Sequence, residues 1–145
     1  MKKILIQIIF ILLIVSISFV FKTLASSDKL EQDAIDVQLE KCIEKDYSTS
    51  GMNKCVYAAT DAWLEQISIY SNMIKKELSK EQFTVFVEAQ KAWEHYYEIE
   101  KKLIVETVYN KEEGTIHTNI AAGMLQNLAK QRALYLKSYL YEVKE

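Results

Sequence analysis

The 145-residue sequence contains no proline and only three glycines. These residues supply many of the turns that a many-stranded fold needs, so their scarcity argues against a β-sandwich or a β-barrel. Histidine and cysteine are also scarce, at two each, which leaves few ligands for a transition metal and few groups for nucleophilic catalysis. The sequence therefore predicts one small domain made of helices.

The longest apolar run lies near the N-terminus, at residues 4–21, directly after two lysines. Small residues around Ala25 follow the run, and this order of charged, apolar and small segments is typical of an export signal. We therefore assign residues 1–25 to a signal peptide and residues 26–145 to an exported domain of the periplasm or cell envelope. An uncleaved membrane anchor is the alternative, because the run is long enough to span a bilayer.

The exported part is acidic. The signal segment holds three lysines and no acidic residue, so residues 26–145 carry 15 basic and 20 acidic side chains, a net charge of −5. Such a surface disfavours nucleic acid and anionic lipid, and it attracts a basic protein through long-range electrostatics. We therefore expect a protein partner, no nucleic acid, and contact with a membrane only through residues 4–21 if they stay uncleaved.

Both cysteines, Cys42 and Cys55, lie in the exported part, where an oxidising compartment favours a disulfide. A zinc site would need two further ligands, and His95 and His117 lie far along the chain. Residues that break and cap helices stand between the cysteines, so the bridge would join two consecutive helices across their turn.

Apolar residues recur every three or four positions along several segments, which is the period of an amphipathic helix. The spacing predicts four helices, over residues 29–45, 52–78, 80–109 and 116–143. A capping box of Ser79 and Gln82 marks the start of the third helix. Helices joined by short connections pack most simply as an antiparallel bundle, so we predict a small all-α bundle with one disulfide behind the signal or anchor helix.

Three of the four helices carry long stripes. In the second, the stripe is Met52, Cys55, Ala59, Trp63, Ile67, Tyr70 and Ile74. In the third it is Phe86, Gln90, Trp93, Tyr97 and Glu100, a broad aromatic face around which we expect the other helices to pack. In the fourth it is Ile116, Ile120, Met124, Leu128, Arg132, Tyr135 and Tyr139. Because Gln90 needs a hydrogen-bond partner on such a face, we expect a buried polar network with Arg132 that fixes the helix register.

Several short motifs occur in the order found in a known family. They are Cys42 with Cys55, the AQKAW run at residues 89–93, Gly114 with Thr115, and Arg132 with Leu136. Over residues 42–136 the chain resembles the lysozyme inhibitor LprI-like domain, formerly a domain of unknown function. The resemblance implies an exported helical protein that inhibits a lysozyme-type muramidase. It also implies a second disulfide, whose cysteines are absent from this sequence.

No motif for catalysis, metal or cofactor binding is evident. Glu94, His95 and Glu98 lie within one helical turn, but the Glu-x-x-His repeat of di-metal bundles is absent. Acidic residues on a long helix usually form a solvated face, with pairs such as Glu98 and Lys102. No phosphate-binding loop, nucleophile elbow or haem motif occurs. We therefore expect a protein that is not an enzyme and needs no cofactor or metal.

A protein inhibitor of a muramidase can place a loop in the cleft that holds the enzyme's two carboxylates. The predicted bundle offers two connections, residues 47–51, which the disulfide would stiffen, and residues 110–115. Their candidate contact residues are Tyr47, Ser48, Thr49, Lys111, Glu112, Glu113 and Thr115. Two other interpretations stay open: an immunity protein against one secreted effector, and a non-inhibitory module that binds peptidoglycan or an envelope protein.

Overall fold

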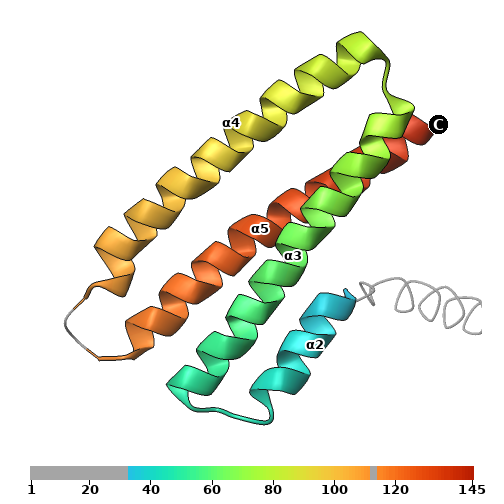
Figure 1. The fold of residues 1–145 in the computed structure, drawn as a ribbon. Helices are drawn as coiled ribbons and strands as arrows, with labels where there is room; N and C mark the ends of the chain where they lie inside the picture. Colours follow the sequence, from blue (N-terminus) through green and yellow to red (C-terminus); the bar gives the residue numbers. More distant parts are fainter. Residues whose placement is uncertain (1–32, 112–113) are drawn as a thin grey trace, which may run out of the picture. The chain divides into compact units, whose positions relative to one another are not determined.

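The computed structural model describes residues 33–111 and 114–145, and residues 34–145 form one compact unit (Figure 1). Its elements are α2 (Ala34–Ile43), α3 (Thr49–Glu77), α4 (Lys80–Ile104), the π-helical η1 (Val105–Tyr109) and α5 (Ile116–Lys144). Consecutive helices run antiparallel, whereas α3 and α5 run parallel and side by side. No strand occurs in the described ranges, and the predicted all-α bundle is confirmed.

The predicted signal or anchor helix and its boundary at residue 25 lie outside the described residues. The first helix was expected to begin near residue 29, but Asp33 is not helical and α2 begins at Ala34. Within residues 33–111 and 114–145, no helix combines the length and the apolar character that crossing a membrane requires.

Side-chain caps set the starts of α3 and α4. Ser48 Oγ accepts a hydrogen bond from the Gly51 N–H at 3.0 Å, so α3 begins at Thr49, earlier than the predicted residue 52. The predicted capping box of α4 is confirmed. The Gln82 N–H donates to Ser79 Oγ at 3.3 Å, and the Ser79 N–H donates to Gln82 Oε1 at 2.8 Å.

The core lies mainly between α3 and α5. Trp63 and Ile74 of α3 and Leu136 of α5 are the largest side chains that are fully buried. The predicted stripe of α3 is confirmed, since Cys55, Ala59, Trp63, Ile67 and Ile74 are all buried. Tyr97 is the member of α4 that joins this cluster.

The predicted stripe of α5 is wrong. Four of its seven members are exposed, by 56 % for Ile116, 47 % for Ile120, 43 % for Met124 and 59 % for Tyr135, and the other three, Leu128, Arg132 and Tyr139, are only half-buried. The buried face consists instead of Ala121, Ala122, Ala129, Ala133, Leu136 and Leu140. Small side chains let two helices approach closely, so the alanine face of α5 packs against α3 and the bulkier residues occupy other faces.

The aromatic stripe of α4 does not form the centre of the bundle as expected. Of this helix only Tyr97 and Ile104 are buried, whereas Phe86, Gln90, Trp93 and Glu100 are half-buried. Phe86 and Trp93 pack against the edge of the core, as α4 lies to one side of the pair α3 and α5 (Figure 1). Their broad rings therefore keep one side accessible.

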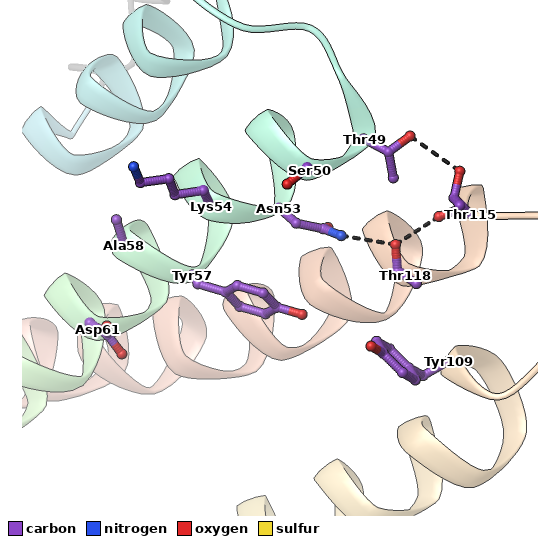
Figure 2. A pocket seen from close by; sticks show the side chains of 10 residues that line it. All are labelled: Thr49, Ser50, Asn53, Lys54, Tyr57, Ala58, Asp61, Tyr109, Thr115 and Thr118. Atoms are coloured by element: carbon purple, nitrogen blue, oxygen red, sulfur yellow. Dashed lines mark hydrogen bonds between the residues drawn. The ribbon is translucent and has the colours of Figure 1, made fainter.

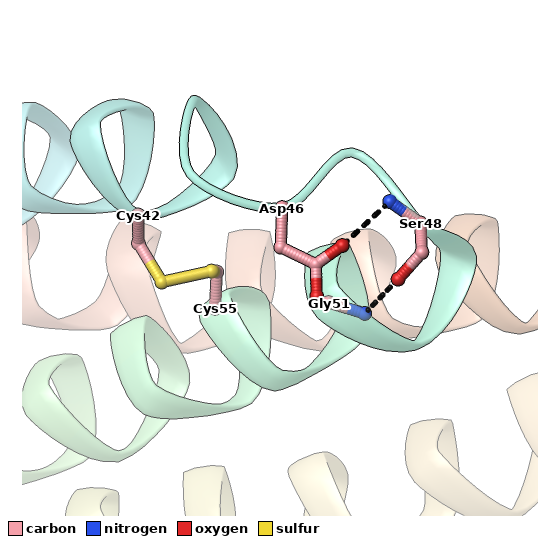
Figure 3. The surroundings of a disulfide bond; sticks show 5 residues. All are labelled: Cys42, Asp46, Ser48, Gly51 and Cys55. Atoms are coloured by element: carbon pink, nitrogen blue, oxygen red, sulfur yellow. Dashed lines mark hydrogen bonds between the residues drawn. A yellow bond between two sulfur atoms is a disulfide. The ribbon is translucent and has the colours of Figure 1, made fainter.

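The disulfide between Cys42 and Cys55 is confirmed and joins α2 to α3 (Figure 3). An ion pair adds a second attachment, because Lys130 Nζ of α5 lies 2.6 Å from Asp36 Oδ2 of α2. The same ammonium group lies 5.8 Å from the centre of the Trp63 ring. The short α2, which buries no residue fully, is thus held by a covalent bond and a charge contact.

Replacing Trp63 with alanine is expected to destabilise the domain by about 3–5 kcal/mol, because removal of a side chain only 1 % exposed leaves a cavity between α3 and α5. The matched variant Trp93→Ala is expected to cost less, since that side chain is half-buried. Urea unfolding followed by circular dichroism measures both losses. Equal losses would contradict this placement of the core.

Reduction of the disulfide is expected to lower the free energy of unfolding by about 3 kcal/mol, because it frees a loop with a sequence separation of 13 in the unfolded chain. The helices themselves should persist, since the α3–α5 core does not depend on the bridge. Melting curves of the oxidised protein and of a Cys42→Ser, Cys55→Ser double variant test this. An unchanged melting temperature would show that the bridge does not constrain the chain.

Candidate functional site

Hydrogen bonds fix the connection between α2 and α3. Asp46 Oδ1 accepts from the Ser48 N–H at 2.9 Å, and Ser48 in turn caps Gly51 (Figure 3). A Cβ atom on Gly51 would lie 2.1 Å from the Asp46 carboxyl carbon, so any other residue there would displace the Asp46 side chain from its hydrogen bond with Ser48. The connection is therefore a defined turn, closed on one side by the nearby disulfide.

The electrostatics of this turn favour the ionised form of Asp46. The hydrogen bonds from the side chain and the backbone of Ser48, together with the charge of Lys54, lower the pKa of the Asp46 carboxyl group. Tyr47 stands between these two bonded residues and is 68 % exposed. The Tyr47 side chain is therefore exposed to solvent, on a turn whose residues on either side of Tyr47 are fixed by hydrogen bonds.

The connection between α4 and α5 meets this turn at the same end of the bundle. Thr49 Oγ1 lies 3.3 Å from Thr115 Oγ1, a hydrogen bond between residues 66 apart in the sequence (Figure 2). Asn53 Nδ2 donates to Thr118 Oγ1 at 2.8 Å, and Thr118 donates to the Thr115 carbonyl at 2.7 Å. Both connections that the sequence singled out therefore lie side by side. We call the described parts of these connections, residues 46–51, 110–111 and 114–115, the paired loops.

A shallow groove of about 760 Å³ opens beside the paired loops (Figure 2). Tyr57 of α3 and Tyr109 of η1 line it, and each is 44 % exposed. Lys54 and Asp61 add one charge of each sign. The groove therefore presents two exposed aromatic rings beside hydroxyl and charged groups, and tyrosine is among the residues enriched at protein–protein interfaces.

The predicted contact residues have different positions in this region. Tyr47 and Lys111 are exposed, whereas Ser48 and Thr49 mainly cap and begin α3. Thr115 joins the two loops. Glu112 and Glu113 lie outside the described residues.

Sequence reasoning missed several residues of the groove, namely Asn53, Lys54, Tyr57, Asp61, Tyr109 and Thr118. Tyr57 lies off the buried stripe of α3, which predicts exposure, but single exposed aromatic residues are common and do not by themselves indicate a site. No sequence pattern indicates Tyr109. Its position depends on η1, where the Asn110 N–H donates to the Val105 carbonyl at 3.1 Å and widens the last turn.

The predicted contact between Gln90 and Arg132 is present between α4 and α5, apart from the paired loops, although both side chains are half-buried and not fully buried. Arg132 Nε donates to Gln90 Oε1 at 2.9 Å, and Arg132 Nη2 donates to the same oxygen. The guanidinium lies 5.7 Å from the centre of the Trp93 ring and 5.4 Å from that of Tyr135. Burial lowers the pKa of Arg132, against the opposing effect of Tyr135, but an arginine stays charged.

The acidic residues of α4 do not assemble a site. Glu98 forms an ion pair with Lys101 at 2.9 Å, so the predicted pair of Glu98 with Lys102 is wrong. In the part of the chain that the structure describes, no group of three or more histidine, cysteine, aspartate or glutamate side chains could hold a metal ion.

Comparison with known proteins now identifies the fold and the family. The model of the family described as lysozyme inhibitor LprI matches residues 41–136. The chain belongs to this family. The matched part of this LprI chain contains the disulfide, both paired loops and the contact between Gln90 and Arg132.

A solved structure of an uncharacterised protein from Burkholderia thailandensis is similar, with a TM-score of 0.72 and 23 % sequence identity. The likeness covers 79 % of this chain and 56 % of the other, so the LprI chain spans little more than half the length of that protein. At this identity the comparison shows the fold alone. No curated protein matches the chain.

The turn of Asp46 gives a prediction for acid stability. Because its pKa is lowered from the usual 3.8 on folding, the carboxylate contributes stability at pH values above 3.8, and this contribution is lost as the pH falls through the lowered value. Asp46→Asn is expected to be less stable than the wild type at neutral pH, and the difference is expected to shrink in acid. Urea unfolding at pH values from neutral to below 3.8 measures this difference, with Asp61→Asn as the control for removal of another exposed carboxylate. A difference between the wild type and Asp46→Asn that does not depend on pH would contradict the role given to Asp46.

Proposed function

We propose that this protein is exported and inhibits a lysozyme-type muramidase by placing the paired loops at the mouth of the enzyme's cleft. Membership of the lysozyme inhibitor family supports the kind of partner. The observation that carries the proposed mode of binding is the junction of the two loops through Thr49 and Thr115, with Tyr47 exposed beside it.

The constraints on the loops favour tight binding. An exposed tyrosine has few rotatable bonds and a large apolar ring, so it loses little conformational entropy when it enters a pocket. The turn around Tyr47 is bonded through Asp46, Ser48 and the disulfide, so its backbone is also ordered before binding. The contact therefore needs little reorganisation.

Charge supports the same orientation. Muramidases cleave glycans with two carboxyl groups in a cleft, which a cation can approach. Lys111 is exposed on the second of the paired loops and supplies that charge. The net charge of −5 on residues 26–145 attracts a basic enzyme from a distance, so association should slow as salt is added.

Tyr47→Ala is expected to weaken inhibition of a lysozyme by about tenfold or more, as expected for loss of a central aromatic contact. The control is Tyr141→Ala, because Tyr141 is 65 % exposed, close to the 68 % of Tyr47, and lies near the C-terminus at the opposite end of the bundle (Figure 1). Lysis of bacterial cells by lysozyme, measured as loss of turbidity at increasing inhibitor, gives both inhibition constants.

Two results would contradict the proposal. If excess folded protein leaves the rate of lysis unchanged, the protein does not inhibit that lysozyme. If the protein inhibits but Tyr47→Ala and Tyr141→Ala behave alike, inhibition does not proceed through the paired loops.

A further inference from the structure

A second cleft lies between α4 and α5, nearer the end of the bundle opposite the paired loops. It encloses about 380 Å³, within the range of about 300–1,000 Å³ that small-molecule sites occupy. Its walls are mostly apolar and aromatic, with Val85, Phe86 and Ala89 from α4 and Tyr135, Leu136 and Tyr139 from α5. The cleft exists because α4 lies at the margin of the core and its stripe is only partly covered.

Aromatic rings form a row along this cleft. The Tyr135 and Tyr139 rings lie 6.4 Å apart with an angle of 14° between their planes. The Tyr139 and Phe86 rings follow at 6.3 Å and 12°. Three rings with nearly parallel planes thus follow one another along the cleft, and Tyr135 remains 59 % exposed. An extended apolar chain could lie along it and bury area on both sides.

A cation stands at one end of the row. The Arg132 guanidinium lies 5.4 Å from the centre of the Tyr135 ring and lines the cleft. Two of its nitrogens, Nε and Nη2, donate to the neutral Gln90 side chain. Residues 33–111 and 114–145 offer Arg132 no carboxylate within ion-pair distance. A half-buried charge of this kind is stabilised when an anion with hydrogen-bond acceptors reaches it.

We propose that the cleft binds a monocarboxylate with an extended apolar chain, its carboxylate at Arg132 and its chain along Tyr135, Tyr139 and Phe86. Phe83 continues the row outside the cleft, with Lys75 over its ring, but Arg132 is the one cationic residue among those that line the cleft, which supports a ligand with a single anionic group. The volume supports a small molecule, because it lies within the range that small-molecule sites occupy. The site is separate from the paired loops, so its test does not depend on the proposed function.

Titration of the full chain with dodecanoate tests the proposal. Binding is measured by calorimetry and by tryptophan fluorescence, since the Trp93 ring lies 5.7 Å from the Arg132 guanidinium carbon. Dodecanol and dodecyltrimethylammonium are the comparison ligands, with the same chain and either no charge or the opposite charge. Dodecanoate is expected to bind about tenfold or more tightly than dodecanol, because a hydrogen bond to a charged group is lost with the alcohol. Equal binding of the three would overturn the proposal.

Variants locate the site and separate it from the apolar N-terminal segment of the full chain. Arg132→Met is expected to abolish the preference for dodecanoate over dodecanol, whereas Arg132→Lys should keep part of it. Val85 is 66 % exposed at the rim, so a matched pair, Val85→Glu and Val85→Lys, changes the charge there without disturbing the core. Val85→Glu is expected to weaken dodecanoate binding about fivefold relative to Val85→Lys.

The Val85 pair keeps the test decisive if Arg132→Met fails to fold, which circular dichroism would show. Dodecanoate binding that is the same in Val85→Glu and Val85→Lys would place the ligand elsewhere and overturn the proposal. A doubling of the mass in sedimentation, with or without dodecanoate, that Val85→Glu abolishes would show that a second copy occupies this face and would overturn the proposal.

Discussion

The close contact between Trp63 and the alanine face of α5 is the constraint on which the arrangement of the other helices depends. Trp63 is large and almost fully buried, and Ala129 and Ala133 on the facing helix have no exposed surface. Short side chains on α5 let its backbone come near enough for the indole to fill the space between the helices. Because α3 and α5 run parallel, the chain has to run back along the bundle before α5 begins. α4 makes this return, and it lies beside the α3–α5 interface rather than within it.

The marginal position of α4 explains why it is joined to α5 by a polar contact as well as by apolar packing. The side chain of Gln90 receives two hydrogen bonds from Arg132, and a shift of α4 by one turn would break both. The contact thus fixes the register of a helix that buries only Tyr97 and Ile104. Because α4 does not cover α5 completely, the Arg132 guanidinium and the Phe86 and Tyr135 rings remain partly exposed.

The features that could be predicted from the sequence are those that depend on neighbours within a few residues. The capping box at Ser79 and the buried stripe of α3 are local patterns, and both are correct. The spacing of large residues predicts the wrong buried face for α5, because the close contact with α3 requires small residues such as Ala129. The hydrogen bond between Thr49 and Thr115 joins residues 66 apart and depends on the tertiary arrangement, so no local pattern indicates it.

The motifs that carry the family resemblance fall into two groups in space. Cys42 with Cys55 and Gly114 with Thr115 build the end that carries the paired loops, where Gly114 adopts a φ of 79° that other residues rarely accept. The AQKAW run at residues 89–93 supplies Gln90 and Trp93 to the contact with Arg132 on α5. The first group orders the exposed loop end of the bundle. The second holds α4, which buries only Tyr97 and Ile104, against α5. The two groups therefore act on different parts of the bundle, the first on the α2–α3 turn and its neighbour at the loop end and the second on the contact between α4 and α5.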